Sequence, residues 1–245
     1  DGDGLADVRS VLLEGLRSPF GMALVGSDLY VANTDAIVRF AYQTGQTHIT
    51  APGTVVVDLP AGPINHHWTK SLIASLDGKK LYVTVGSNSN IGENGLEAEI
   101  GRAAIWEVDL ATRSKRLFAT GLRNPNGLDW NPRSGELWTT VNERDMLGSD
   151  LVPDYLTNVP LGAQYGWPWV YWKKNIDDRV TDPMPRDMYS YVRKPEYGLG
   201  SHVAPLGLAF ARGGSALSFL VAVERRRGAA RVAVVVAVAV VVVIV

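Results

Sequence analysis

The segment SPFGMALVGSDLYVANTDAIVRFAY, residues 18–42, decides the fold because its pattern recurs along the chain. It contains a glycine, a short apolar run, a turn, an alternating strand and then a second strand. The same order returns in HWTKSLIASLDGKKLYVTVGS at 67–87 and in RNPNGLDWNPRSGELWTTVNE at 123–143. A fourth copy begins in HVAPLGLAFARGG at 202–214 and then loses the pattern. The first three copies start roughly 50 to 56 residues apart, and the fourth about 80 residues later.

Repeats of about 50 residues, each with three or four antiparallel strands, are typical of a β-propeller. Further alternating segments between turn-forming residues predict strands at Ala36 to Tyr42, Thr54 to Leu59, Ala104 to Leu110 and Lys115 to Ala119. No long stretch shows the 3.6-residue apolar period of a buried helix. We therefore expect an all-β β-propeller with about four blades in this chain, with a β-sandwich or another all-β meander as the alternative. Because an arc of four blades leaves sheet edges exposed, the copies predict part of a larger ring.

Composition narrows the classes of function. The formal net charge of −1 provides no basic field that would attract nucleic acid. The absence of cysteine excludes disulfides, thiolate metal sites and cysteine nucleophiles. Residues 1–10 lack the basic start and the apolar run of a signal peptide. The sequence also contains no phosphate-binding glycine loop and no Gly-x-Ser-x-Gly turn, which argues against nucleotide chemistry and against an α/β hydrolase.

The last segment differs in composition from the rest. Of the 35 residues from Ala211 to Val245, 25 are Ala, Val or Arg, and residues 232–245 are all Val, Ala or Ile. That apolar run is shorter than the ~20 residues of a membrane-spanning helix, and its β-branched residues favour a strand. We therefore divide the chain into a partial propeller at 1–210 and a Val/Ala/Arg-rich tail at 211–245. The tail is interpreted as a truncated or mis-framed end, with a buried strand or a clipped membrane segment as the alternatives.

Two blade-entry loops, NHHWTK at 65–70 and LRNPNG at 122–127, hold the polar side chains His66, His67, Arg123 and Asn124. In a propeller, the turn that enters the innermost strand lies at the mouth of the central channel, so these loops are expected to converge on one pocket. An imidazole suits general-base work near neutral pH, and an arginine offers a charged fork to a carboxylate or an oxyanion. The alternative is that the histidines only hold backbone groups and that the arginine braces two blades. Adjacent histidines on a strand cannot both reach one metal ion.

Three other segments have alternative readings. The loop at 139–159 is rich in oxygen ligands suited to Ca²⁺, or is simply a solvated acidic loop; its acidic residues are Glu143, Asp145, Asp150 and Asp154. The stretch at 164–172 packs five aromatic residues into nine and is either the wall of a pocket for a sugar ring or part of the core. The start, DGDGLAD at 1–7, has the Asp-x-Asp-Gly spacing of a calcium loop without its glutamate, or forms a plain turn.

Five motifs in one order together resemble the sorbosone dehydrogenase family: SPFGMALVGSDLYVANTD, HHWTKSLIASLDGKKLYVTVGSNSN, LRNPNGLDWNP, VNERDMLGSDLVPDYLT and YGWPW. This family is related to the soluble glucose and aldose sugar dehydrogenases that use pyrroloquinoline quinone (PQQ). The resemblance covers roughly residues 1 to 210. It implies a six-bladed propeller with PQQ over the channel mouth and a calcium ion that bridges cofactor and protein.

The resemblance also implies roles for single residues. His67, directly before Trp-Thr, matches the family's catalytic base, and His66 stands where the glucose enzymes carry an aspartate near the cofactor. Arg123 and Asn124 match the arginine and asparagine that contact PQQ. In the loop that follows, the resemblance makes one residue a cofactor neighbour and two residues carbonyl donors to calcium, in the order Glu143, Arg144 and Asp145.

The function that the resemblance implies is oxidation of a sugar or a sugar-derived aldehyde or alcohol, of the sorbosone or aldose type, with hydride transfer to PQQ and His67 as general base. The expected partners are a small-molecule sugar or aldehyde and an external electron acceptor, a quinone or a cytochrome, and no nucleic acid. The family also implies a periplasmic or secreted location. Two alternatives stay open: a non-catalytic propeller that serves as a binding module, and a calcium-dependent propeller hydrolase of the lactonase type.

Overall fold

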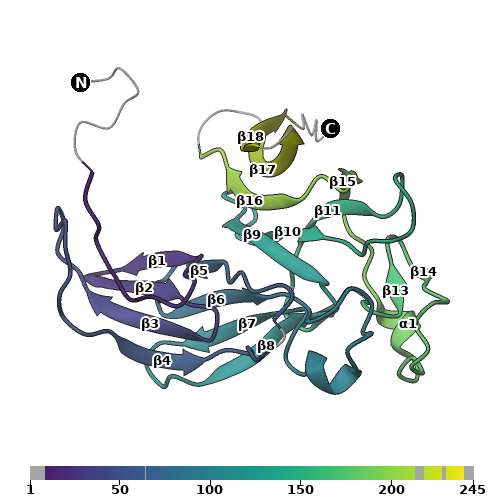
Figure 1. Ribbon diagram of the computed structural model, residues 1–245, viewed down its shortest axis with the longest axis horizontal. Helices are drawn as coiled ribbons and strands as arrows, with labels where there is room; N and C mark the ends of the chain where they lie inside the picture. Colours follow the sequence, from purple (N-terminus) through teal and green to yellow (C-terminus); the bar gives the residue numbers. More distant parts are fainter. Residues whose placement is uncertain (1–8, 64, 213–217, 228–229, 240–245) are drawn as a thin grey trace.

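The structure, a computed structural model, describes residues 9–63, 65–212, 218–227 and 230–239 (Figure 1). The Asp-x-Asp-Gly segment at 1–7 lies outside the described residues. Nearly all regular structure is β. The first sheet has the order β1-β2-β3-β4 and consists of the strands Met22–Val25, Asp28–Ala32, Ala36–Ala41 and Thr54–Asp58.

The next two sheets repeat this antiparallel order. The second contains β5 (Leu72–Ala74), β6 (Lys80–Val85), β7 (Ala104–Asp109) and β8 (Lys115–Thr120), and β12 (Ala163–Gln164) pairs in parallel with β8. The third contains β9 (Asn124–Trp130), β10 (Leu137–Asn142), β11 (Pro153–Asn158) and β15 (Tyr197–Ser201). The fourth contains β16 (Pro205–Phe210), β17 (Ser218–Arg227) and β18 (Ala230–Ala239).

The remaining elements are short. They are the two-stranded ribbon β13 (Val170–Tyr171) and β14 (Asn175–Ile176), the 3₁₀ helix η1 (Leu96–Glu99) and the one-turn helix α1 (Met188–Tyr191). No helix in the described part of the chain is long and apolar enough to cross a membrane.

The first strands of the four sheets lie next to one another. β5 contacts β1 on one side and β9 on the other, and β9 also contacts β16. Each sheet then runs outward from this row through antiparallel neighbours, as the blades of a propeller do. The expected all-β propeller with about four blades is confirmed.

Apolar residues between consecutive blades form the core. Residues from both sheets meet between the first and second blades, including Tyr30, Ile37, Val57, Leu81 and Val108, all buried. A second cluster joins the second blade to the third, and a smaller one joins the third blade to the fourth. Apolar side chains of each blade face the neighbouring blade. Each sheet is therefore stabilised mainly by burial against that neighbour.

The repeat is visible in single hydrogen bonds. In the second blade, Ser71 donates its backbone N–H to the Thr84 hydroxyl at 2.9 Å. In the third blade, Gly127 donates to the Thr140 hydroxyl at 3.0 Å. Both residues of the second pair lie 56 positions after those of the first, from 71 to 127 and from 84 to 140. The two blades therefore use the same tie between their first and second strands.

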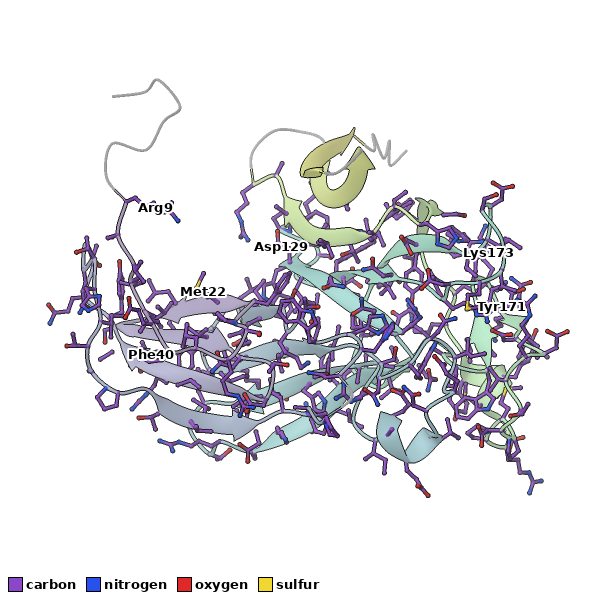
Figure 2. The ribbon with its side chains drawn as sticks, viewed as in Figure 1. Arg9, Met22, Phe40, Asp129, Tyr171 and Lys173 are labelled. Atoms are coloured by element: carbon purple, nitrogen blue, oxygen red, sulfur yellow. The ribbon has the colours of Figure 1, made fainter. Side chains whose placement is uncertain are left out.

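The fourth blade is joined to the third by a buried carboxylate. Asp129 on β9 accepts a hydrogen bond from the backbone N–H of Phe210 at 2.7 Å and pairs with Arg212 at 3.1 Å (Figure 2). Beyond this point β16 pairs with β17 and β17 with β18, which agrees with the strand preference of the tail. The division at residue 210 and the origin of the tail stay predictions.

The aromatic stretch at 164–172 lies largely inside the molecule. Tyr165 and Trp167 are 4% and 5% exposed. The Tyr165 ring stacks on Tyr155 at 6.3 Å, and the Trp167 indole donates to the carbonyl of Asn90 at 2.9 Å. Of the two alternatives for this stretch, the core role is therefore the one that Tyr165 and Trp167 fill.

Candidate functional site

The entry loops of the second and third blades do come together. His67 precedes β5, and Asn124 is the first residue of β9. Both side chains approach Gly86, at the end of β6: a Cβ atom on Gly86 would lie 2.5 Å from the Cβ of His67 and would collide with Asn124 Oδ1. A glycine is needed here because the two loops meet over its backbone.

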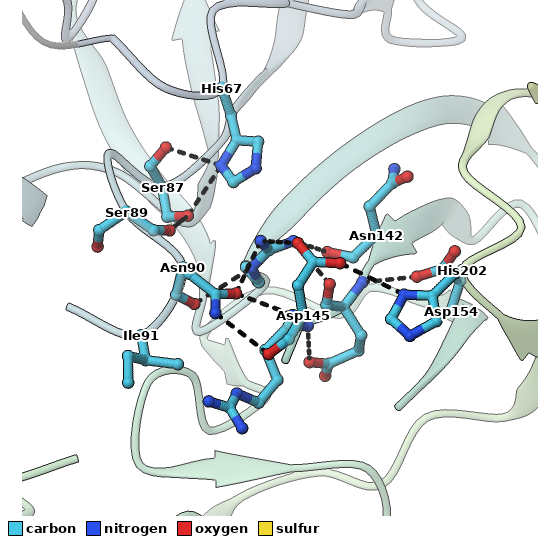
Figure 3. A network of polar contacts seen from close by, with 12 residues as sticks. His67, Ser87, Ser89, Asn90, Ile91, Asn142, Asp145, Asp154 and His202 are labelled. Carbon is cyan, nitrogen blue, oxygen red and sulfur yellow. Dashed lines mark hydrogen bonds and ion pairs between the residues drawn. The ribbon is translucent and has the colours of Figure 1, made fainter. Parts of the chain in front are cut away.

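His67 is held by one ring nitrogen only. Its Nδ1 lies 2.9 Å from the carbonyl oxygen of Ser87 and 3.0 Å from the Ser87 hydroxyl (Figure 3). That hydroxyl donates its own hydrogen to the carbonyl of Ser89 at 2.6 Å, so both Ser87 oxygens act as acceptors toward the ring. Nδ1 therefore carries the proton, and Nε2 keeps its lone pair in the neutral ring.

The surroundings of His67 oppose its protonation. Burial, then the charge of Arg123, then His66 lower the pKa of His67 from 6.5 to about 3, while the hydrogen bond to Ser87 acts in the opposite direction. The imidazole is therefore neutral at physiological pH. It is also a weaker base than a free histidine, unless a negative charge nearby offsets the field of Arg123.

His66 and Trp68, on either side of His67, face solvent. His66 is exposed, and its ring meets the His67 ring edge to face with centroids 4.6 Å apart. Trp68 is 44% exposed and meets Phe20 of the first blade at 6.4 Å. The two histidines lie in a bend before β5 and not on a strand.

Arg123 is buried, with 2% of its surface exposed, and its guanidinium makes five hydrogen bonds within the protein. Nε donates to the carbonyl of Asn90 at 3.2 Å, and Nη1 donates to two carbonyls at the end of β10, Asn142 at 3.3 Å and Glu143 at 2.6 Å. Nη2 donates to Asn90 Oδ1 at 2.9 Å and to Asp145 Oδ2 at 2.8 Å. A guanidinium has five N–H groups, so these acceptors match the number of its donors.

Asn124 presents the opposite case. The residue is 9% exposed, and its Oδ1 is buried with no hydrogen-bond partner among the residues that the structure describes. A buried amide oxygen that lacks a donor costs free energy, and such atoms are often satisfied by water or by a ligand. The unsatisfied oxygen lies beside Gly86, next to His67.

The loop after β10 holds the other three candidates. Glu143 is buried, and burial raises the pKa of its carboxyl to about 7. The Arg144 side chain pairs with Asp177 at 3.0 Å, and both side chains are almost fully buried. Asp145 is 54% exposed, and its carbonyl accepts a hydrogen bond from Asn90 Nδ2 at 3.1 Å.

Asp154 ties this loop to the fourth blade. Its two carboxylate oxygens accept from the backbone N–H groups of Glu143 and Ala204, at 2.8 and 2.9 Å. Asp150 is exposed. In the part of the chain that the structure describes, no group of three or more His, Cys, Asp or Glu side chains could hold a metal ion. Any calcium bound by the described residues of this loop would therefore depend on backbone carbonyls.

Sequence reasoning missed several members of the network, among them Ser87, Asn90 and His202. Ser87 and Asn90 lie in the β6–β7 connection, where the sequence SNSNIGENG reads only as a polar loop. His202 begins the fourth repeat, one position before the residue equivalent to His67 and Arg123, and its place at a blade entry is the signal that could have pointed to it. Its Nδ1 lies 3.3 Å from Asp145 Oδ1, and Gly148 and then the charge of Asp145 raise the pKa of His202.

Two family models match the chain. The family model described as TrAA12-like matches residues 5–162, and the one described as Glucose / Sorbosone dehydrogenase matches residues 107–222. The chain is 25% identical over 208 residues to an uncharacterized protein of Borreliella burgdorferi, covering 81% of the chain and 53% of that protein. It is 28% identical over 155 residues to an aldose sugar dehydrogenase of Escherichia coli, covering 61% of the chain and 35% of that enzyme. The chain thus spans about half the length, or less, of these curated relatives.

Solved structures show the same fold. The calcium structure of a Trichoderma reesei carbohydrate-active enzyme of family AA12 has a TM-score of 0.71 at 20% identity, over 89% of this chain and 65% of that one. The holo form of the PQQ domain of pyranose dehydrogenase from Coprinopsis cinerea has a TM-score of 0.71 at 20% identity, over 91% and 64%. The resemblance to the sorbosone dehydrogenase family is confirmed by the matching domain model. The TrAA12-like family model covers residues 5–162, which is more than half of the chain, and the chain therefore belongs to the TrAA12-like family.

Proposed function

We propose that the protein oxidises a sugar or a sugar-derived aldehyde or alcohol, with PQQ as the cofactor and with calcium. The observation that carries the proposal is the state of His67: a neutral imidazole, anchored through Nδ1 to Ser87, with the lone pair of Nε2 unused by that anchor. Matches to a glucose and sorbosone dehydrogenase domain and to sugar dehydrogenase relatives support the substrate class. Similarity to a PQQ-bound domain and to a calcium structure supports the cofactors.

The residues present fit such a ligand at two points. Asn124 Oδ1 is a buried acceptor without a donor, and a bound molecule could supply that donor. His67 and this oxygen lie close to the same side of Gly86, since a Cβ atom built there would be within 2.5 Å of both side chains. The five hydrogen bonds of Arg123 all go to protein acceptors. For the expected contact with PQQ, Arg123 must therefore exchange one of these acceptors for the cofactor. Asp145 is the most exposed of those acceptors and is therefore the easiest to displace. Glu143, Arg144 and Asp145 stay candidates as neighbours of cofactor and metal, the last two through their carbonyls.

In this proposal His67 accepts the proton of the substrate hydroxyl, or of an aldehyde hydrate, at Nε2. PQQ, when bound, supplies the acceptor for the hydride, and calcium supplies positive charge beside it. Ser87 keeps the ring in the tautomer that the reaction needs, and burial together with the charge of Arg123 disfavours protonation of His67 before a substrate arrives. Exposed His66 is assigned to the shape of the opening and not to proton transfer.

The external acceptor follows from electron counting. Each oxidation of the substrate leaves two electrons on the cofactor, so a second reaction must remove them, and a quinone or a cytochrome is the proposed class of partner. The periplasmic or secreted location stays a prediction from the family resemblance.

The test compares two neighbouring imidazoles. The chain, and a version extended to a complete ring of blades, are titrated with PQQ in the presence of calcium, and reduction of a dye acceptor is then measured with aldoses and sorbosone. We expect His67→Gln to lower turnover by about 10²- to 10⁴-fold, since it removes the general base. His66→Gln is the matched control and should stay near the wild-type rate. Near wild-type turnover in His67→Gln would refute the assignment, and a failure of both chains to bind PQQ would refute the cofactor.

A further inference from the structure

Asn90 stands where three segments of the molecule meet. It lies in the β6–β7 connection of the second blade, and every polar atom of the residue is used. Its N–H donates to Glu93 Oε1 at 2.9 Å, and its carbonyl accepts from Arg123 Nε at 3.2 Å and from the Trp167 indole at 2.9 Å. Its side chain is therefore held in place by a fixed backbone.

The Asn90 side chain joins the second blade to the third. Oδ1 accepts from Arg123 Nη2 at 2.9 Å and from the backbone N–H of Asp145 at 2.8 Å (Figure 3). Nδ2 donates to the carbonyl of Asp145 at 3.1 Å. The amide thus holds Arg123 with its oxygen and grips the following loop at both of the backbone groups of Asp145. An amide is needed for this arrangement, because a carboxylate has no donor for the carbonyl.

We call the contacts of the Asn90 amide with Arg123 and Asp145 the clamp. The clamp fixes where the charge of Arg123 lies. Two of the five guanidinium hydrogen bonds end on Asn90, and a third ends on Asp145, whose backbone Asn90 holds. Arg123 and Arg102 are charged groups near His67, and the ring of His66 packs edge to face against it. His67 itself does not contact the clamp, since its ring is anchored on Ser87.

We propose that Asn90 is a positioning residue for the reaction: it locks the Arg123 guanidinium in one orientation, holds the Asp145 loop beside it, and so fixes the place of the charge that faces His67. Only the link to the reaction rests on the proposed function. The titration of His67 is read in the protein without cofactor or substrate. A failure of this inference is therefore distinguishable from a failure of the dehydrogenase assignment.

The experiment follows imidazole NMR signals of the full chain against pH. The chain has four histidines, so each signal can be assigned from a single His→Gln variant. In Asn90→Ala we expect the midpoint of His67 to rise by about one pH unit toward its ordinary value, because a loosened Arg123 is better screened by water. We also expect the guanidinium N–H groups of Arg123 to exchange with solvent faster than in the wild type.

Two further variants keep the test decisive. Asn131→Ala is the matched control: Asn131 is a buried loop amide of the third blade, at the opposite end of β9, and its Oδ1 accepts from the backbone N–H groups of Arg133 and Ser134 at 2.9 and 3.3 Å. It should leave the midpoint of His67 unchanged. Asn90→Asp keeps the acceptor for Arg123 and is the variant to be measured if Asn90→Ala does not fold. Its added negative charge should raise the midpoint of His67 while the Arg123 N–H groups stay protected. An unchanged His67 midpoint in a folded Asn90 variant, or an equal rise in Asn131→Ala, would overturn the inference.

Discussion

The entry loops of the second and third blades place His67 and Arg123 at equivalent positions, and the two side chains have opposite environments. Each bonds to the backbone carbonyl of the residue twenty positions later, His67 to Ser87 and Arg123 to Glu143. His67 makes that contact through one nitrogen and leaves the other without a role in the anchor. Arg123 adds four further contacts and is buried.

The difference shows that a repeat fixes the position of a side chain but not its use. Both blades supply the same carbonyl at the end of the second strand. In the third blade that strand is followed by the loop with Asp145, and Asn90 of the second blade reaches across to it, so these neighbours accept the hydrogen bonds of Arg123. Among the residues that the structure describes, the His67 ring has hydrogen-bonding contacts with Ser87 alone, so its other nitrogen stays available for chemistry.

The largest effect is expected from Arg123→Ala. Removal of the buried guanidinium takes a donor from the carbonyls of Asn142 and Glu143 and leaves Asp145 without its partner, so unfolding free energy should fall by about 3–5 kcal/mol. Urea denaturation followed by tryptophan fluorescence measures the change. Arg39→Ala is the control, because that arginine is 41% exposed and its pair with Asp28 at 3.5 Å should contribute at most about 1 kcal/mol. Equal losses in the two variants would mean that Arg123 does not hold the loops.

A smaller loss is expected where the two loops touch. In Gly86→Ala the added methyl group collides with Asn124 and His67, which should cost about 1–3 kcal/mol of stability by overpacking. The same denaturation series measures it. Gly26→Ala provides the comparison. Nothing lies within 4 Å of the added atom there, so its cost comes from the φ of +59° and not from a collision. A Gly86 variant as stable as the wild type would show that the entry loops of the second and third blades are not packed together at Gly86.

Another pair of equivalent positions in the second and third blades, 56 residues apart, differs in side-chain charge. Lys70 of the second blade and Asn126 of the third are both fully buried. Burial, followed by the charge of Arg102, lowers the pKa of Lys70 from 10.5 to about 7. Between these values the unfolded chain binds a proton that the folded chain does not, so stability should rise with pH by up to about 1.4 kcal/mol per unit. Lys70→Met should remove that rise, as measured by denaturation from pH 7 to 10. The same pH slope in the variant would contradict the assignment.

The smallest effect is expected from Asp145→Asn. The carboxylate pairs with Arg123 at 2.8 Å but is 54% exposed, so the variant should cost at most about 1 kcal/mol and depend on salt. Denaturation at low and high ionic strength measures this. A loss as large as that of Arg123→Ala would show that the carboxylate, and not the backbone carbonyls, holds the arginine.

Most of the strands could be predicted from the sequence. The expected segments at 36–42, 54–59, 104–110 and 115–119 agree within two residues with Ala36–Ala41, Thr54–Asp58, Ala104–Asp109 and Lys115–Thr120. Alternation and turn residues are local, so a strand can be recognised without its neighbours. The candidates His67, Arg123 and Asn124 were also accessible, because the repeat places them at blade entries. The role of Asn90 was not, since its partners lie 33, 55 and 77 positions away.

The sequence by itself determined the period of the blades, the strand order within each blade and the polar residues at the blade entries. These follow from the alternation of side chains along a strand and from short turns, both of which act over a few residues. Only the tertiary structure decided that Arg123 is saturated and buried while His67 keeps one nitrogen available, and that Tyr165 and Trp167 belong to the core. Those outcomes depend on which loops meet across neighbouring blades, where burial and hydrogen bonding are set by residues far apart in the chain.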